Sequence, residues 1–100
     1  MSTSPLSILL TKKADADNTD VLNYITEKFG SVYADKFLGK LTDLFKLISH
    51  QPFIGRPAKQ DPTIRVFVLS KQNKIVYKIT ESEIVILRVL NFKTRASENF

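Results

Sequence analysis

With 100 residues, 43% of them hydrophobic, the chain has the size and composition of one folded domain and is too apolar for a disordered protein. It has no cysteine, which excludes disulfide bonds, thiolate metal sites and thiol catalysis. No apolar run approaches the roughly 20 residues of a membrane-spanning helix, and the N-terminus lacks the pattern of a secretory signal. We therefore expect a cytoplasmic protein without a membrane partner.

The net charge of +5 is confined to the C-terminal half. Residues 1–50 contain six lysines and six acidic residues, whereas residues 51–100 contain nine lysines and arginines and only four acidic residues. A surface of this kind attracts polyanions, so nucleic acid, a ribosome or an acidic protein segment is a candidate partner. The alternative is that the charge serves only to keep the protein soluble.

The N-terminal half predicts one strand followed by two helices. The apolar residues 7–11 indicate a strand, and the acidic and capping residues at 14–20 indicate the start of a helix that ends at Gly30. Ser31 can cap a second helix, whose apolar residues recur at spacings of three and four from Ala34 to Ile48. The short break between the helices predicts an antiparallel helical hairpin.

A proline-rich loop and three β-rich runs follow. Residues 50–57 contain two prolines and a glycine, which is typical of a loop. The runs at 64–69, 74–80 and 84–90 are separated by short polar turns, which favours consecutive antiparallel hairpins. The predicted fold is α+β with the order β-α-α-β-β-β, in which the helical hairpin packs on one face of an antiparallel sheet.

Alternation along the run 74–80 assigns its side chains to the two faces of this sheet. The odd-numbered positions are apolar and are assigned to the face that the helices cover, so Tyr77 points into the core. Lys74 and Lys78 are assigned to the open face, because a buried unpaired lysine is costly.

The turns decide which side chains of the neighbouring strands share the open face. A four-residue turn at 70–73 would put Arg65 and Phe67 beside the two lysines. In the last hairpin, a two-residue turn would place Arg88 under the helices, whereas a three-residue turn at 81–83 places it on the open face; we expect the second, which avoids burying a guanidinium. The predicted open face is basic and partly apolar, with Lys93 and Arg95 at its edge, and contains Arg65, Phe67, Lys74, Val76, Lys78, Ile86 and Arg88. Such a face either binds a partner or is exposed to solvent, with the aliphatic parts of its own lysine and arginine side chains packed over the apolar residues.

Short motifs along residues 7–95 occur in an order that resembles a known family. The first strand is followed by TKKA at 11–14, the loop at 51–57 reads QPFIGRP, and the closing strands contain IVYKI and IVILRVL. The loop is similar to the P-x-x-G-R-P loop of ParE-like proteins, and the set resembles the RelE/ParE superfamily of bacterial toxins from type II toxin–antitoxin systems. The resemblance implies one toxin domain at residues 7–95, between a flexible tail at 1–6 and a C-terminal tail at 96–100.

The resemblance also implies partners. Toxins of this superfamily, which include the plasmid-stabilisation type, arrest growth and are neutralised by a cognate antitoxin. The basic face of the sheet is the expected binding surface for that antitoxin. Operator DNA is contacted only indirectly, through the antitoxin. The expected partner-binding residues are Arg56, Arg65, Phe67, Lys74, Lys78, Arg88, Lys93 and Arg95.

Two toxic mechanisms are known in the superfamily. RelE-like members cut mRNA on the ribosome with basic residues and often a tyrosine near the C-terminus, whereas ParE-like members inhibit DNA gyrase by binding. If the chain is a nuclease, its catalytic candidates are Arg65, Lys74, Lys93 and Arg95. Phe100 lies about where the tyrosine would be and has no hydroxyl, so we expect a gyrase inhibitor. An mRNA endoribonuclease and a non-toxic corepressor are the alternatives.

Two further residues need an interpretation. His50, at the end of the second helix, is expected to interact with the negative end of that helix, because one histidine without cysteine argues against a metal site. Arg56 either acts functionally in the loop or caps the carbonyl groups of the same helix. No cofactor is expected.

Overall fold

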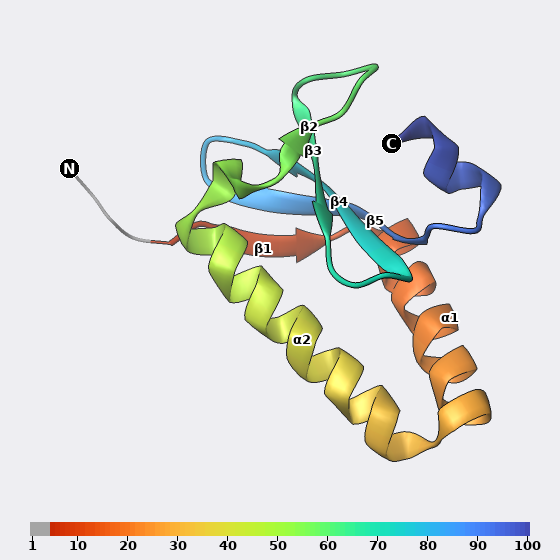
Figure 1. Cartoon of the computed structure of the whole chain (residues 1–100). Coiled ribbons are helices and arrows are strands. Elements are labelled where there is room, and N and C mark those ends of the chain that lie inside the picture. Colours follow the sequence, from red (N-terminus) through yellow and green to blue (C-terminus); the bar gives the residue numbers. More distant parts are fainter. Residues whose placement is uncertain (1–4) are drawn as a thin grey trace.

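In the computed structural model, which describes residues 5–100, a helical hairpin covers one face of a five-stranded sheet (Figure 1). The strand order is β1-β5-β4-β3-β2, and β1 is parallel to β5 while the other pairs are antiparallel. The elements are β1 (Ser7–Leu10), α1 (Lys12–Phe29), α2 (Ser31–His50), η1 (Pro52–Ile54), β2 (Arg56–Pro57), β3 (Ile64–Val68), β4 (Asn73–Ile79), β5 (Glu83–Asn91) and η2 (Arg95–Asn99).

The predicted α+β class, element order and helical hairpin are confirmed. The sheet is mixed rather than wholly antiparallel, because β1 lies beside β5, and the two-residue β2 extends the opposite edge. Four residues of the expected N-terminal tail, 1–4, lie outside the described ones. None of the helices in residues 5–100 is long and apolar enough to cross a membrane.

Local signals explain where the helices begin and end. The hydroxyl of Thr11 accepts the backbone N–H of Ala14 at 3.0 Å and so caps α1, which begins two residues before the acidic segment. Gly30 has a φ of 94°, a conformation that favours glycine, and it ends α1 as predicted. The apolar stripe of α2 is buried through Phe37, Leu41 and Ile48.

The predicted register between β3 and β4 is wrong by one residue. Lys74 lies opposite Val68, so Phe67 lies opposite Ile75 and Arg65 opposite Tyr77. The connection is longer than predicted, because the carbonyl of Asn73 accepts the N–H groups of both Leu69 and Ser70. Arg65 and Phe67 therefore share the face of Tyr77, which is the face that the helices cover.

The predicted turn of the last hairpin is also wrong. The turn has two central residues, 81 and 82, and Ile79 lies opposite Ile84, which sends Ile86 into the core under the helices. A bulge at Leu87 then shifts the alternation, so that Arg88 lies opposite Val76. The bulge places Arg88 on the face of Val76, as predicted although for a different reason, and its guanidinium is paired with a carboxylate on α1.

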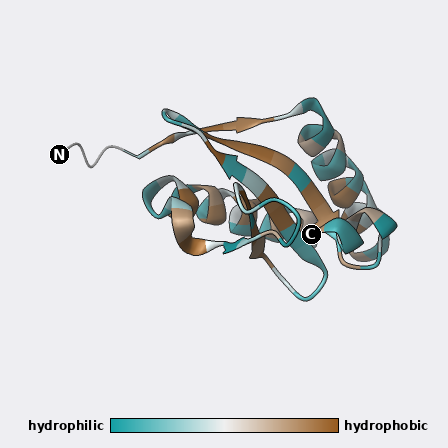
Figure 2. Cartoon of the chain, turned by 90° about the horizontal axis from the view of Figure 1, so that it is seen from above, coloured by the Kyte–Doolittle hydropathy of each residue, from teal (hydrophilic) through white to brown (hydrophobic). Residues whose placement is uncertain are grey.

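The second face of the sheet is not open. Val66, Val76 and Leu90 are buried there together with Ala58, and Ala96 and Phe100 pack against them from the C-terminal segment. Figure 2 shows that the long strands are mostly hydrophobic, while both helices carry bands of hydrophilic and hydrophobic residues. The sheet thus has an apolar layer on each side, and η2 covers part of the face that was expected to bind partners.

Candidate functional site

The P-x-x-G-R-P loop is fixed by two side chains from the sheet. The hydroxyl of Tyr77 donates to the carbonyl of Pro52 at 2.7 Å and accepts the N–H of Gly55 at 2.9 Å. Tyr77 is fully buried, as its parity predicts, and burial raises the pKa of its hydroxyl. The guanidinium of Arg65 donates to the carbonyls of Phe53 and Gly55 and lies over the Phe53 ring. Arg65 therefore holds this loop.

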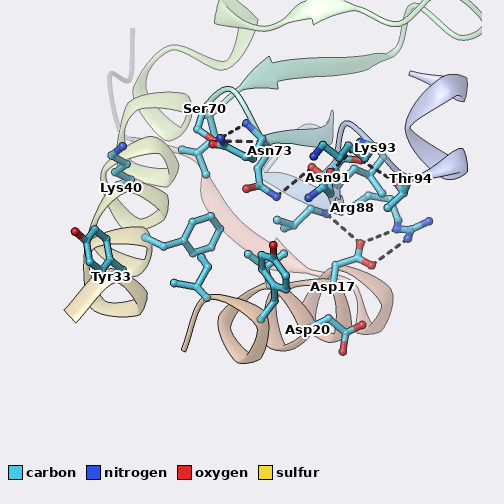
Figure 3. A pocket seen from close by; sticks show the side chains of 18 of the residues that line it. Asp17, Asp20, Tyr33, Lys40, Ser70, Asn73, Arg88, Asn91, Lys93 and Thr94 are labelled. Atoms are coloured by element: carbon cyan, nitrogen blue, oxygen red, sulfur yellow. Dashed lines mark hydrogen bonds and ion pairs between the residues drawn. The ribbon is translucent and has the colours of Figure 1, made fainter. Parts of the chain in front are cut away.

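Arg88 is bound by Asp17 of α1 (Figure 3). Its Nε donates to the carboxylate of Asp17 at 2.6 Å, and its second nitrogen donates at 3.0 Å. The same carboxylate accepts the N–H of Val89 at 3.0 Å. The hydrogen bond with Asp17 raises the pKa of the Arg88 guanidinium. Asp17, interpreted from the sequence only as an acid at a helix start, thus ties α1 to β5.

Lys74 and Arg56 are held by the C-terminal segment. Lys74 is only 4% exposed, and its ammonium donates to the carbonyl of Ser97 at 2.9 Å while lying over the ring of Phe92. Burial and the neighbouring positive charge of Arg56 lower the pKa of Lys74. The guanidinium of Arg56 donates to the main-chain oxygen of Phe100. Arg56 therefore does not cap α2, where His50 instead interacts with the carbonyl of Lys46 as predicted.

The eight predicted partner-binding residues do not form one surface. Arg65 and Phe67 lie on the helix-covered face, and Arg88 is paired with Asp17. The exposed cations are distributed over several elements: Lys78 on β4, Lys93 after β5 and Arg95 in η2. Arg56 and Lys74 lie close enough for the positive charge of Arg56 to lower the pKa of Lys74.

A groove that the sequence did not reveal lies between the helical hairpin and the sheet (Figure 3). It has a volume of about 880 Å³ and extends from the tip of α1 and α2 to the β3–β4 turn and the end of β5. Its apolar wall includes Val21, Tyr24, Ile25, Phe29 and Phe37.

Aromatic side chains of the groove wall are unusually exposed. Tyr24, Phe29 and Tyr33 are each more than half exposed, and the rings of Phe29 and Tyr33 are 6.1 Å apart. The charged lining residues are three lysines, Lys36, Lys40 and Lys93, together with Asp20 and the ion pair of Asp17 and Arg88. Helical spacing alone cannot predict the exposure of Phe29, because it does not show that the tip of the hairpin projects beyond the sheet (Figure 1).

Lys74→Met is expected to leave stability at neutral pH unchanged or increased, because the buried ammonium donates to a carbonyl and forms no ion pair within residues 5–100. As pH rises, Lys74 of the wild type loses its proton in the folded state before it does so in the unfolded state, where the pKa of this lysine is near 10.5. Between the two pKa values the unfolded state binds more protons than the folded state. The free energy of unfolding of the wild type therefore rises as pH approaches 10.5, and the Lys74→Met variant lacks this increase.

Urea unfolding of both proteins at a series of alkaline pH values measures this difference. The raised pKa of Tyr77 affects the two proteins equally and cancels in the comparison. Stability curves that run parallel for wild type and variant across the alkaline range would contradict the assignment.

Comparisons with known proteins agree with this architecture. The family model described as "ParE toxin of type II toxin-antitoxin system, parDE" matches residues 8–94. A search of curated proteins found no match. A solved structure described as the chromosomal ParDE system from P. aeruginosa is 24% identical, with a TM-score of 0.74 over 86% of this chain and 95% of that chain.

Two more distant structures share the fold. The YoeB/ParE toxin from Agrobacterium tumefaciens is 14% identical, with a TM-score of 0.62 over 86% of this chain and 98% of that one. The RelBE2 toxin–antitoxin complex from Mycobacterium tuberculosis is 18% identical, with a TM-score of 0.57 over 87% and 98%. The resemblance to the RelE/ParE superfamily is therefore confirmed, and the chain belongs to the ParE toxin family of type II toxin–antitoxin systems.

Proposed function

We propose that this toxin inhibits DNA gyrase by binding it and is held inactive by a cognate antitoxin. The match of the ParE family model to residues 8–94 carries the proposal. The geometry favours binding over RNA cleavage, because Arg65 and Lys74 lie on opposite faces of the sheet. Lys74 is buried under η2, and Phe100 has no hydroxyl to transfer a proton.

Purified protein added to gyrase tests the target. We expect loss of supercoiling and an increase in gyrase-dependent DNA cleavage, both reversed by the antitoxin that a neighbouring gene encodes. Unchanged gyrase activity at high molar excess, together with new codon-phased mRNA 5′ ends after induction, would instead identify a ribosome-dependent endoribonuclease. Unimpaired growth on overexpression without the antitoxin would identify a non-toxic corepressor.

We further propose that the antitoxin docks in the groove rather than on the basic sheet face. The basic face is partly covered by η2, whereas the groove presents half-exposed aromatic rings from the hairpin tip. An amphipathic helix places its apolar side chains in such a groove, and a segment that orders on binding can wrap a large surface. The three lysines that line the groove outnumber its one unpaired acidic residue among the described ones, Asp20, and so favour acidic residues on the polar side of that helix.

Phe29→Asp is expected to weaken antitoxin binding by roughly a hundredfold, because it places a charge among the aromatic rings of the groove. Phe29 is 61% exposed, so the fold should tolerate the change. Val32→Asp is the matched control, since Val32 is 64% exposed on the same hairpin tip but does not line the groove.

Isothermal titration of each variant with the antitoxin measures the effect, and circular dichroism checks the fold. Equal affinities for the Phe29→Asp and Val32→Asp variants would remove the groove from the proposal without affecting the gyrase target.

A further inference from the structure

The P-x-x-G-R-P loop, residues 52–57, exposes a large apolar side chain outside the groove. Phe53 is 69% exposed, which is the largest fraction among the large apolar side chains of residues 5–100, and the neighbouring Ile54 is 39% exposed. Neither residue lines the groove or packs in the two apolar clusters of the sheet. The loop begins at the end of α2 that lies opposite the hairpin tip (Figure 1), and the 20 residues of α2 span about 30 Å.

The backbone of this loop is fixed by side chains of the sheet. The hydroxyl of Tyr77 accepts the N–H of Gly55 and donates to the carbonyl of Pro52. The guanidinium of Arg65 donates to the carbonyls of Phe53 and Gly55, and its central carbon lies 4.9 Å from the centroid of the Phe53 ring. The exposed ring is therefore carried by a fixed backbone, and binding it to a partner costs less conformational entropy than ordering a flexible loop would.

Positive charge borders the loop. Residues 46–66 contain two lysines and two arginines but only one acidic residue, Asp61. Arg56 and Lys59, which follow the apolar pair along the chain, are exposed, and Lys78 lies opposite Ile64 on the neighbouring strand. A cationic border of this kind favours a partner whose contact surface is acidic.

The chemistry of the loop fits a protein partner better than a nucleic acid. An aromatic ring beside an aliphatic side chain, bordered by charged residues, has the composition of the central part of a protein interface. Proteins that bind single-stranded nucleic acid instead present aromatic rings on which successive bases stack. The loop has one ring, and one face of that ring is occupied by Arg65.

We propose that the toxin binds its target protein through the P-x-x-G-R-P loop, with Phe53 inserted into an apolar pocket of the target that acidic residues border. The inference rests on the proposed function, in which toxicity results from binding to gyrase. Because the loop and the groove share no residue, the target and the antitoxin bind at separate sites. An antitoxin in the groove then neutralises the toxin by its bulk, which keeps a large target from reaching the loop.

Phe53→Ala tests this contact in the gyrase supercoiling assay. We expect the toxin concentration that gives half-inhibition to rise about tenfold or more, because truncation of a central aromatic residue has large effects at protein interfaces. Ile54→Ala should raise it less. The hydrogen bonds from Tyr77 and Arg65 reach backbone atoms of the loop, so alanine at position 53 keeps them and the fold should be retained.

Leu9→Ala is the matched control for loss of an exposed apolar side chain. Leu9 is 50% exposed on β1, at the opposite edge of the sheet from β2. This variant should inhibit gyrase as the wild type does, and all three alanine variants should bind the antitoxin with wild-type affinity in isothermal titration. Phe29→Asp should show the reverse pattern, with weak antitoxin binding and full gyrase inhibition.

Growth arrest on induction without the antitoxin is a measurement that does not depend on the identity of the target. We expect Phe53→Ala, produced at the wild-type level, to relieve the arrest and Leu9→Ala to maintain it. A wild type that arrests growth but leaves gyrase unaffected would contradict the proposed function alone, because the growth comparison would still test the loop.

Four results would overturn the role of the loop. Phe53→Ala could be as toxic as the wild type, or it could lose antitoxin affinity together with toxicity, which would contradict separate sites. A wild type without any toxicity would leave the loop without a target. Binding of the wild type to a single-stranded oligonucleotide, weakened by Phe53→Ala and not by Leu9→Ala, would assign the ring to a nucleic acid instead of a protein.

Discussion

Gly55→Ala is expected to destabilise the fold by about 3 kcal/mol or more and to lower the melting temperature by roughly 15 °C. A Cβ at this position would lie 2.7 Å from the Tyr77 hydroxyl and 2.9 Å from the carbonyl oxygen of Val66. The backbone of Gly55 has a φ of −73°, which any residue can adopt, so the cost is purely steric. Because Val66 contributes a backbone atom, rotation of a side chain cannot relieve the whole clash.

The loss should extend beyond the contact itself. Pushing Tyr77 aside breaks its hydrogen bonds to Pro52 and Gly55 and leaves buried polar groups without partners. Tyr77→Phe should therefore cost about 2 kcal/mol by itself. The double variant should cost less than the sum of the two, because the phenyl ring has no hydroxyl to clash with the new methyl group.

Gly39→Ala is the matched control for thermal and urea unfolding. Gly39 lies in the middle of α2, and a Cβ there would meet no atom within 4 Å. Alanine should stabilise the exposed helix by about 0.5–1 kcal/mol. If Gly55→Ala is as mild as Gly39→Ala, the close approach of the loop to Tyr77 is not what stabilises this region.

The helices and the inward face of β4 were predictable because periodicity determines them locally. The stripe ending at Ile48 and the parity of Tyr77 each follow from one element, and both are confirmed. The registers of β3 and β5 were not predictable in the same way. They depend on the hydrogen bonds that Asn73 makes in its turn and on an extra residue at Leu87, and a slip of one residue reverses every side chain of a strand.

The candidate sites were harder to predict, because they depend on contacts between segments far apart in the chain. The positive charge of the C-terminal half is evident from composition, but composition does not show which of these cations form ion pairs or hydrogen bonds with other parts of the chain. Nothing near Arg88 in the sequence indicates that Asp17, 71 residues away, will bind it. Lys74 was assigned correctly to the face opposite Tyr77, yet that face is covered by residues expected to form a tail. The groove arises only when the hairpin tip is placed beside the β3–β4 turn.

Asp17→Ala is expected to lower stability by about 2 kcal/mol. The carboxylate accepts two hydrogen bonds from Arg88 and one from the N–H of Val89, so its removal leaves three donors without their partner. The side chains of Arg88 and Asp17 are 21% and 15% exposed, and water reaching them reduces the cost below that of a fully buried pair.

Arg88→Ala should cost less than Asp17→Ala, because Asp17 keeps its hydrogen bond from Val89 and its access to solvent. Asp17→Asn should fall between them, since the amide oxygen can still accept from Val89 but carries no charge to attract the guanidinium. Urea unfolding of the two alanine variants and of the double variant gives a coupling energy, which should be clearly favourable and fall with added salt. Equal losses in the two alanine variants would show that the contact with Val89 contributes nothing, and that Asp17 stabilises the junction of α1 and β5 only through its charge.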